Sequence, residues 1–370
     1  MESLPPLPEP LDAGAPLDDG GAPVDAGANG DGGPSRWQAV TDSLAQAVSA
    51  GEVPGYQFVV RTEADQPVYA SAGGAFSAQT VIPFDSSIKP ITSALVLTLV
   101  RDGQLALTDT LGARLGWTGP EAAVTIEQLL AFSSGFPGSS PCLTPPPQLR
   151  NGQLVEPANR APLEQCANTI RSAGLVAPPG TEFHYGANHQ LLLAVVAERV
   201  TGKSWNALFD ERLAMPVGLE PGSVRYVNNR VAASAVGTAD AFARLYRALA
   251  LDGGFLRGQS ATILLPRPLM DRFTENVTRD RSIRLADTPW EPTGREVHFG
   301  LGVWIECTDW ARRDTCVFFG SGGNGTTVWI DPSSGHVGAL VLYQGSFTRY
   351  RTGYTLMTRL LPLVRAAIQR

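Results

Sequence analysis

The run from Ile91 to Val100 is apolar on nearly every face of a helix, and this feature constrains the fold more than any other in the chain. A surface helix carries one apolar stripe, whereas a helix that is apolar all round must be enclosed by the rest of the protein. The turn that leads into the run contains Ser86 and Lys89, and a spacing of three places both side chains on one face of that turn. The sequence therefore predicts a buried helix whose first turn presents a hydroxyl beside an ammonium group.

A lysine held against a serine inside a protein is costly, because the ammonium group loses its hydration. The arrangement is readily explained if Ser86 is a nucleophile and Lys89 moves its proton, with Ser87 facing away from the lysine. The structural alternative is that Ser86 caps the helix and Lys89 is a surface charge beside the cap. Lysine usage favours catalysis: only Lys89 and Lys203 among the 29 basic residues are lysine, and an ammonium group has a more adjustable pKa than a guanidinium group.

Length and charge limit the class of protein. A chain of 370 residues with 43% hydrophobic content can bury a sizeable core. The formal charge is -6, but residues 1–35 hold seven acids and no basic residue, so the remainder carries about +1. No nucleic-acid partner is expected from this balance. No apolar run reaches the length of a membrane span, and the start lacks the charged and apolar regions of a signal peptide.

Residues 1–35 consist mainly of Asp, Gly, Ala and Pro, a composition with almost nothing to bury. We expect them to form a disordered spacer in front of a folded domain at 36–370. Such a spacer is typical of a domain that is secreted, periplasmic or held at the cell surface. Its acids lack the spacing of an EF-hand calcium loop.

The four cysteines are two pairs of neighbours in the sequence, Cys142 with Cys166 and Cys307 with Cys316. Neither pair has the CxxC spacing of zinc or redox sites. The first pair brackets a proline-rich loop and the second flanks a possible hairpin, so two local disulfides and an oxidising compartment are predicted. Free buried thiols are the alternative.

Strand patterns lie near both ends of the chain, with helical patterns between them. This order predicts an α+β domain in which an antiparallel sheet is flanked by helices and carries an inserted helical lobe. Residues 136–179 are expected to be an irregular part of that lobe. Helices are expected at about 36–49, 91–100, 125–132, 188–200, 205–213, 238–250 and 352–368, and strands at 56–61, 68–71, 297–306, 316–319, 326–330 and 337–343.

Three separated segments resemble the serine β-lactamase and penicillin-binding-protein superfamily, in particular its class C β-lactamase-like branch of DD-peptidases and esterases. Ser86–Lys89 is similar to the SxxK motif of that family, and Pro179–Tyr185 looks like the segment with its catalytic tyrosine. Gly320–Gly325, which leads into Trp329–Pro332, resembles its last active-site strand. The likeness extends over most of 36–370 and implies a β-lactamase/transpeptidase-like fold.

The resemblance implies a serine hydrolase that forms an acyl-enzyme on Ser86, with Lys89 and Tyr185 handling protons and no metal or organic cofactor. Tyr185 could serve as a base only as a phenolate, so the Lys89 ammonium is expected to lower its pKa. Otherwise Tyr185 is a buried aromatic residue with its hydroxyl on the backbone. The backbone N–H groups of Ser86 and Asn324 are the expected oxyanion donors.

Substrate contacts are expected from four small residues near these motifs: Ser321, Gly322, Gly323 and Ala187. The family usually has Lys or His where this chain has Ser321, and Asn where it has Ala187; Asn188 comes one place late. In the family those groups bind the amide and carboxylate of a substrate. Because this chain lacks them, an ester or other small acyl substrate is predicted. The alternatives are a β-lactamase, a D-Ala-D-Ala peptidase acting on cell-wall peptides, or a non-catalytic penicillin- or peptidoglycan-binding protein.

Other motifs have structural explanations. The glycine-rich Gly320–Gly325 lacks the lysine and following helix of a phosphate loop, and no G-x-S-x-G elbow is present. His184 and His189 are five residues apart, which does not favour a zinc site on one helical face. Ser133 and Ser134 are expected to be structural.

Overall fold

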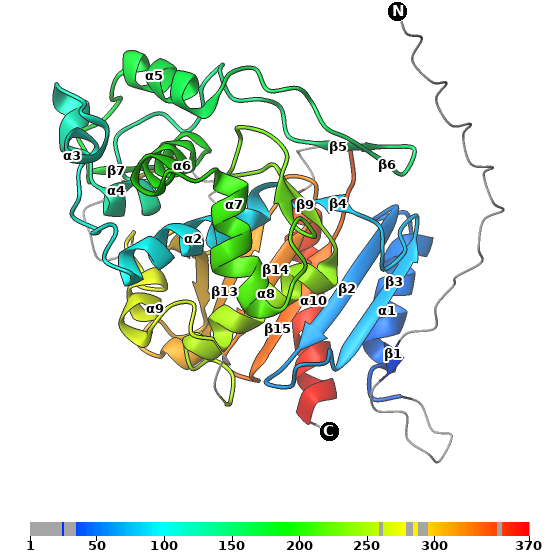
Figure 1. Ribbon diagram of the computed structural model, residues 1–370. Coiled ribbons are helices and arrows are strands. Elements are labelled where there is room, and N and C mark those ends of the chain that lie inside the picture. Colours follow the sequence, from blue (N-terminus) through cyan, green and yellow to red (C-terminus); the bar gives the residue numbers. More distant parts are fainter. Residues whose placement is uncertain are drawn as a thin grey trace, which may run out of the picture.

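The architecture is an antiparallel sheet with helices on both faces, seen in a computed structural model (Figure 1). The structure describes residues 24–25, 35–258, 262–278, 284–287, 295–345 and 350–369. The predicted α+β class is confirmed. Eight strands form the main sheet in the order β1-β3-β2-β15-β14-β13-β12-β11. They are β1 (Val24–Asp25), β2 (Gly55–Arg61), β3 (Tyr69–Gly74), β11 (His298–Phe299), β12 (Trp304–Cys307), β13 (Cys316–Ser321), β14 (Thr327–Asp331) and β15 (His336–Val341).

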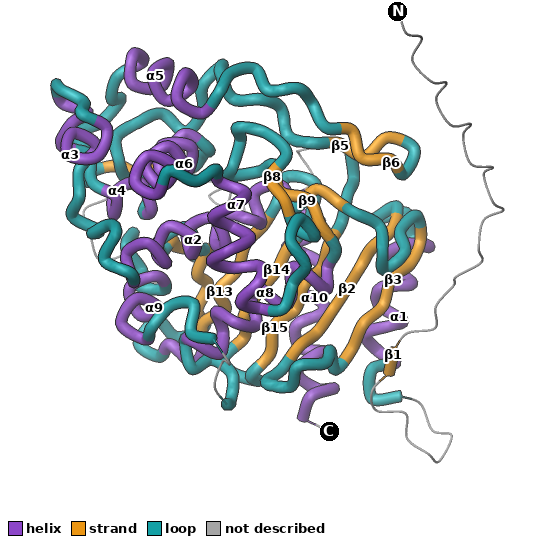
Figure 2. The backbone as a smooth tube through the Cα atoms, viewed as in Figure 1, coloured by secondary structure: helices purple, strands orange, loops and turns teal. Residues whose placement is uncertain are grey.

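The helices and the smaller sheets lie around the main sheet (Figure 2). Three small sheets pair β4 (Ile82–Pro83), β9 (Ala235–Gly237) and β8 (Arg225–Tyr226), β5 (Gln148–Arg150) with β6 (Gln153–Val155), and β7 (Glu182–His184) with β10 (Arg284–Asp287). The α-helices are α1 (Gln38–Ser49), α2 (Lys89–Arg101), α3 (Leu111–Leu115), α4 (Ile126–Leu130), α5 (Leu163–Ala173), α6 (Asn188–Thr201), α7 (Trp205–Phe209), α8 (Ala239–Asp252), α9 (Arg267–Phe273) and α10 (Tyr350–Gln369).

The two faces of the sheet bury separate apolar cores. On one face α1 and α10 contribute side chains such as Leu44 and Leu360, which pack with Phe58 and Trp329 of the sheet. On the other face α2, α6 and α8 form a larger core with the opposite side chains of the same strands. Because successive side chains of a strand point to opposite faces, each central strand serves both cores, and β2, β13, β14 and β15 are buried along their whole length.

The predicted buried helix is α2. Every residue from Lys89 to Leu99 is buried, including the polar Thr92, Ser93 and Thr98. A short 3-10 turn, η1 (Asp85–Ile88), runs directly into it. The all-round apolar character of α2 follows from its place between α6 and the strand β13.

Most predicted elements are confirmed, with shifted ends. The helix expected from residue 36 begins at Gln38, because Ser35 accepts a hydrogen bond from the N–H of Trp37 in the preceding turn instead of capping the helix. The helix expected at 205–213 is regular only to Phe209 and continues as a wider π-type turn at Asp210–Ala214.

The strand predicted at 297–306 is wrong, because the structure has two short strands there, β11 and β12. Between them Gly300 donates its N–H to Val303 O, and Gly302 has a φ of +94°, which residues with side chains rarely adopt. A Cβ at Gly302 would lie 1.9 Å from Ser93 Oγ on α2. This turn therefore brings the chain against α2, and among the described residues the pairing of β12 with β13 ends at Trp304 and Phe319.

The inserted lobe is more regular than expected. Residues 136–179 were expected to be irregular, but they contain the helix α5 and the hairpin β5–β6. Cys142 is bonded to Cys166 on α5, and Cys307 is bonded to Cys316 between β12 and β13. Both predicted disulfides are therefore present.

The spacer prediction lies outside the described residues except at β1, which pairs with β3. No helix in the described part of the chain is both long and apolar enough to cross a membrane.

Candidate active site

Ser86 and Lys89 meet where η1 runs into α2. The Lys89 Nζ donates to Ser86 Oγ over 2.7 Å and to the carbonyl oxygen of Ala232 over 3.1 Å. Lys89 is only 3% exposed, so its amine is largely removed from water. Ser87 faces away, as predicted, and its Oγ donates to Phe84 O at 2.6 Å. The structural alternative for this turn fails, because Ser86 makes no capping bond to α2 and Lys89 is not at the surface.

Tyr185 joins this pair from a distant segment, between β7 and α6. Its hydroxyl is hydrogen-bonded to the side chains of Ser86 and Trp304, and Lys89 Nζ lies 4.8 Å from the centre of its ring. Gln190, one turn into α6, donates to Lys89 O over 2.8 Å and so ties α6 to α2. The structure therefore brings together the serine, the amine and the phenol that the sequence singled out.

The protonation states differ from those expected. Burial raises the pKa of Tyr185 to about 12, against the smaller lowering effect of its bonds to Ser86 and Trp304. Burial lowers the pKa of Lys89 to about 7, with the nearby Arg230 charge acting in the same direction and Asp85 opposing it. The expectation that Lys89 would turn Tyr185 into a phenolate is therefore contradicted. Near neutral pH the site holds a neutral phenol and an amine close to its own pKa.

Asn324 does not occupy the role predicted for it. Its backbone N–H donates to Asp85 Oδ2 at 2.8 Å, and its side-chain amide donates to the same oxygen at 2.7 Å. An N–H that is committed to a buried carboxyl group is not aimed at a substrate oxygen. The assignment of this N–H as an oxyanion donor is corrected on that ground. The other predicted donor, the N–H of Ser86, is at the start of a helical turn, where backbone donors have no intrahelical acceptor.

The glycine-rich segment packs directly on the nucleophile turn. A Cβ at Gly320 would be 2.5 Å from Ser87 O, and one at Gly322 would be 2.6 Å from Phe84 O. The absence of side chains at these two positions is therefore what lets β13 approach η1. Ser321 is 7% exposed with its hydroxyl 3.5 Å from that of Thr327, and Gly323 is half-buried.

Asn188 does not replace the amide that Ala187 lacks. Its Nδ2 donates to Pro137 O at 2.7 Å and to Ser140 Oγ at 2.9 Å, and the residue is fully buried. Ala187 itself is buried and donates its N–H to Gly138 O. Asn188 therefore supports the loop behind Tyr185.

The nearby histidine is also structural. His189 Nε2 is 2.7 Å from His184 O and its Nδ1 is 2.9 Å from Ser134 Oγ. Since a carbonyl can only accept, Nε2 carries the proton and Nδ1 accepts from the serine. Burial lowers the pKa of His189 to about 4, so the ring stays neutral. This confirms the structural role predicted for Ser134.

Two groups of the site were missed by the sequence. Asp85 is inside the motif, but nothing in the sequence indicated that its side chain points to Asn324. No sequence feature indicated that Trp304 belongs to the site, because an isolated tryptophan in an apolar segment is typical of a core residue.

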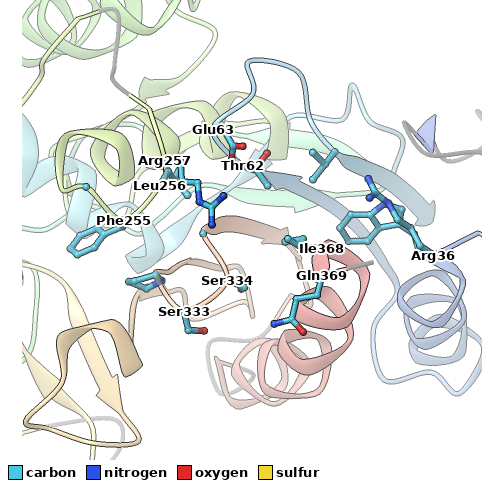
Figure 3. A pocket seen from close by; sticks show the side chains of 15 residues that line it. Arg36, Thr62, Glu63, Phe255, Leu256, Arg257, Ser333, Ser334, Ile368 and Gln369 are labelled. Atoms are coloured by element: carbon cyan, nitrogen blue, oxygen red, sulfur yellow. The ribbon is translucent and has the colours of Figure 1, made fainter.

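No described group of three His, Cys, Asp or Glu side chains is arranged to hold a metal ion. A cavity of about 700 Å³ lies elsewhere, lined by residues that include Arg36, Glu63, Arg257, Ser333 and Ser334 (Figure 3). Ser86, Lys89 and Tyr185 are not among its lining residues, so it is separate from the site.

Comparison with known proteins identifies the class. A sequence model of the beta-lactamase family matches residues 40–357. The chain therefore belongs to the beta-lactamase family, whose fold is shared by serine hydrolases that include esterases, penicillin-binding proteins and beta-lactamases. The predicted family and the prediction of a serine hydrolase are confirmed at this level.

Individual relatives are distant. A Bacteroides dorei protein assigned as a beta-lactamase is 20% identical, with a TM-score of 0.73, over 90% of this chain and 99% of its own. The hydrolase EstCE1, which has promiscuous acyltransferase activity, is 18% identical, with a TM-score of 0.67, over 90% of this chain and 98% of its own. Penicillin-binding protein 4 of Amycolatopsis lactamdurans is 29% identical over 50% of this chain and 48% of its own. The chain spans less than half the length of the curated relatives it matches.

Proposed function

We propose that the protein hydrolyses small acyl esters through an acyl-enzyme on Ser86, with Lys89 as the base. The observation that carries the proposal is the 2.7 Å contact between Lys89 Nζ and Ser86 Oγ in a buried site. A serine hydroxyl is a poor nucleophile without a base in hydrogen-bond reach. A lysine whose pKa is about 7 is neutral in a large fraction of molecules at neutral pH, so it can accept the proton.

The first half-reaction uses Ser86, Lys89 and Tyr185, and the second uses Ser86 and Lys89. Ser86 Oγ attacks the acyl carbon and its proton passes to the neutral Lys89 amine. The leaving alkoxide then takes a proton from the Tyr185 hydroxyl, which its raised pKa keeps protonated, and the Lys89 ammonium returns a proton to Tyr185. In the second half-reaction a water attacks the acyl-enzyme and Lys89 takes its proton. The Lys89 ammonium then returns this proton to Ser86 Oγ as the acid leaves.

The oxyanion donors in this proposal are the N–H groups of Ser86 and Ser321. Gly322 donates its N–H to Thr326 O on the β14 side, and successive N–H groups of a strand point to opposite edges. The N–H of Ser321 therefore points to the edge of β13 that faces away from β14. The paired part of β12 ends at Trp304 opposite Phe319, two residues before Ser321. This edge supports Ser321 in place of Asn324.

The substrate preference rests on what surrounds the nucleophile. Ser321 brings no positive charge to the last active-site strand, Ala187 brings no amide, and Asn188 is turned into the protein. These features support an ester or other small acyl substrate without a required carboxylate. The hydrolase activity of EstCE1, which has a similar fold, supports the same class.

The test is covalent labelling followed by turnover. A fluorophosphonate probe is expected to add one adduct per chain, as measured by intact mass. Ser86→Ala should abolish the adduct, and Ser87→Ala is the matched control that should keep it, because Ser87 Oγ is bonded to Phe84 O. An adduct that persists in Ser86→Ala would contradict the assignment of the nucleophile.

Turnover of three substrate classes separates the alternatives. We expect p-nitrophenyl acyl esters to be hydrolysed much faster than nitrocefin or D-alanyl-D-alanine peptides. Efficient nitrocefin hydrolysis would indicate a beta-lactamase. Stoichiometric acylation by penicillin with no turnover of any substrate would indicate a penicillin-binding protein.

We also infer that the domain works in an oxidising compartment, secreted, periplasmic or at the cell surface. Two disulfides support this, because such bonds persist where thiols are not kept reduced. Protein isolated from its native cells with thiol-blocking reagent present from lysis should carry no reactive cysteine. Four blocked cysteines would contradict the inference.

A further inference from the structure

The residue before the nucleophile makes an unusual connection across the molecule. Asp85 Oδ2 accepts hydrogen bonds from both the backbone N–H and the side-chain amide of Asn324, at 2.8 and 2.7 Å. Asp85 belongs to the η1 turn that holds Ser86, and Asn324 belongs to the turn between β13 and β14. Two hydrogen bonds therefore join the nucleophile turn to the glycine-rich turn that borders it.

The surroundings of this pair make it a built feature of the fold. Asp85 and Asn324 are each 1% exposed. Asp85 has a φ of +49°, in the left-handed region that asparagine, aspartate and glycine tolerate best. A buried carboxyl group in a strained backbone position is retained only where its surroundings hold it in place. Here the two bonds from Asn324 provide that support.

The contact acts at the point where two parts of the site must keep a fixed distance. Gly320 and Gly322 approach the η1 backbone so closely that no side chain fits between them. Glycines also leave the turn conformationally free, so packing alone does not lock its position. The two hydrogen bonds that Asn324 donates to Asp85 supply this constraint.

We propose that Asp85 is a positioning residue, which clamps the β13–β14 turn to the nucleophile turn and so fixes the β13 edge relative to Ser86. The inference rests on the proposed function and deepens it, because it names the residue that aligns the two halves of the same site. Asp85 touches neither the substrate nor the transferred proton in this role. Its effect is on the geometry of acylation.

Three variants separate the clamp from the charge of Asp85. Asp85→Gly keeps the backbone conformation but removes both bonds of the clamp, whereas Asn324→Ala removes the side-chain bond and keeps the backbone N–H donor. Asp85→Gly should lower kcat/KM by about 100-fold, the size expected for misplaced reacting groups, mainly through kcat, and Asn324→Ala should lower it in the same way but by less. Because Asn324→Ala removes part of the contact that Asp85→Gly removes completely, the double variant should lose little more than Asp85→Gly alone.

Asp85→Asn is the conservative variant. Its amide oxygen can still accept both bonds from Asn324, so turnover should stay within about tenfold of the unaltered protein. The charged and titratable groups around Asp85 are Lys89, Tyr185 and Tyr343, and Arg230 acts on Lys89. Since the Asp85 charge raises the pKa of Lys89, its removal should move the acid limb of the pH–rate profile to lower pH.

Asp252→Asn serves as the matched control. Asp252 is a carboxyl group that also accepts two backbone N–H bonds, from Leu264 and Leu265, and it interacts with Arg101 at the other end of α2. Its substitution should leave kcat/KM unchanged. Melting curves of all variants identify any that fail to fold, and Asn324→Ala carries the test if Asp85→Gly is one of them.

The readout is the rate of Ser86 labelling by the fluorophosphonate together with ester turnover. Slow labelling of both clamp variants, a small effect of Asp85→Asn and a non-additive double variant would support the proposal. Labelling of folded Asp85→Gly and Asn324→Ala at the normal rate would overturn the clamp alone. No labelling of Ser86 in the unaltered protein would overturn the proposed function and the clamp with it.

Discussion

The buried polar clusters around Ser86 and around Asp331 differ in how completely their charges are paired. In the Ser86 cluster the Lys89 amine has two oxygen acceptors, neither of them a carboxylate. The second cluster is in the β14–β15 turn, where Asp331 accepts bonds from Ser333, Ser334 and Arg365. Lys89 and Asp331 are both almost fully buried. Both charged side chains are therefore buried, but Asp331 is hydrogen-bonded to the oppositely charged Arg365, whereas Lys89 is bonded to neutral oxygens.

The pKa values of Asp331 and Lys89 differ from their ordinary values in the way that this pairing predicts. Burial tends to raise the pKa of Asp331, but Arg365, His336 and the two serines lower it to about 2. Lys89 has only the weaker opposing effect of Asp85, and its pKa falls to about 7. A well-paired charge is held in one protonation state, whereas a poorly paired one can exchange its proton near neutral pH.

The β14–β15 cluster contains a serine, a histidine and an aspartate, yet its hydrogen bonds run the wrong way for a catalytic triad. Trp329 Nε1 donates to His336 Nε2 at 2.9 Å, so Nδ1 carries the proton and donates to Ser334 Oγ at 2.8 Å. Ser334 in turn donates to Asp331 Oδ2 at 2.6 Å. The histidine cannot take a proton from Ser334, although that serine lines the cavity in Figure 3.

The largest expected contrast is between the two serines. Ser86→Ala should lower ester turnover by roughly 10⁴-fold or more, because the acyl-enzyme cannot form. Ser334→Ala should leave turnover within about threefold, since it removes one hydrogen bond from a structural cluster. Initial rates with a p-nitrophenyl ester measure both. Equal losses would show that the clusters are not functionally distinct.

Replacing Lys89 should affect turnover and the free energy of unfolding in different ways. Lys89→Met should lower turnover by roughly 10³-fold, the range of a lost acid–base group. The free energy of unfolding should stay the same or rise, because the fold disfavours the ammonium form that is removed. Lys203→Met is the control, as Lys203 is exposed and paired with Glu211, and it should change neither quantity. A destabilised Lys89→Met with normal turnover would refute the assigned role.

Acid should weaken the β14–β15 cluster only below about pH 4. The pKa of Asp331 is lowered from 3.8 to about 2 on folding, so its ionised form stabilises the fold above pH 4. That contribution, roughly 2 kcal/mol, is lost as pH falls from about 4 to 2. Urea unfolding of the protein and of Asp331→Asn between pH 2 and 7 should show curves that converge at low pH. Parallel curves would contradict the pKa assignment.

The Ser86 cluster should respond to pH near neutrality instead. Lys89 must be neutral to accept the serine proton, and its pKa is about 7. The value of kcat/KM should therefore fall about tenfold for each pH unit below 7 and level off above 8. A flat profile between pH 5 and 8 would exclude Lys89 as the base.

Local spacing explains which parts of the site were predictable. Ser86 and Lys89 lie in one turn, so their contact follows from helix geometry, and Cys307 and Cys316 face each other because they end neighbouring strands. The pairing of Asp85 with Asn324 joins positions that only the folded chain brings together, and Trp304 reaches Tyr185 in the same way. The strand predicted at 297–306 failed because a turn at Gly300–Val303 fits α2 at that point.

Sequence alone was enough to determine the buried helix α2, the serine–lysine turn at its start, the two disulfides and the α+β class, because each depends on neighbours along the chain or on a repeated pattern. Tertiary structure decided the protonation of Lys89 and Tyr185 and the partner of Asn324. The physical reason is that a pKa depends on lost water and on the nearest charges, and residues from several distant segments supply both.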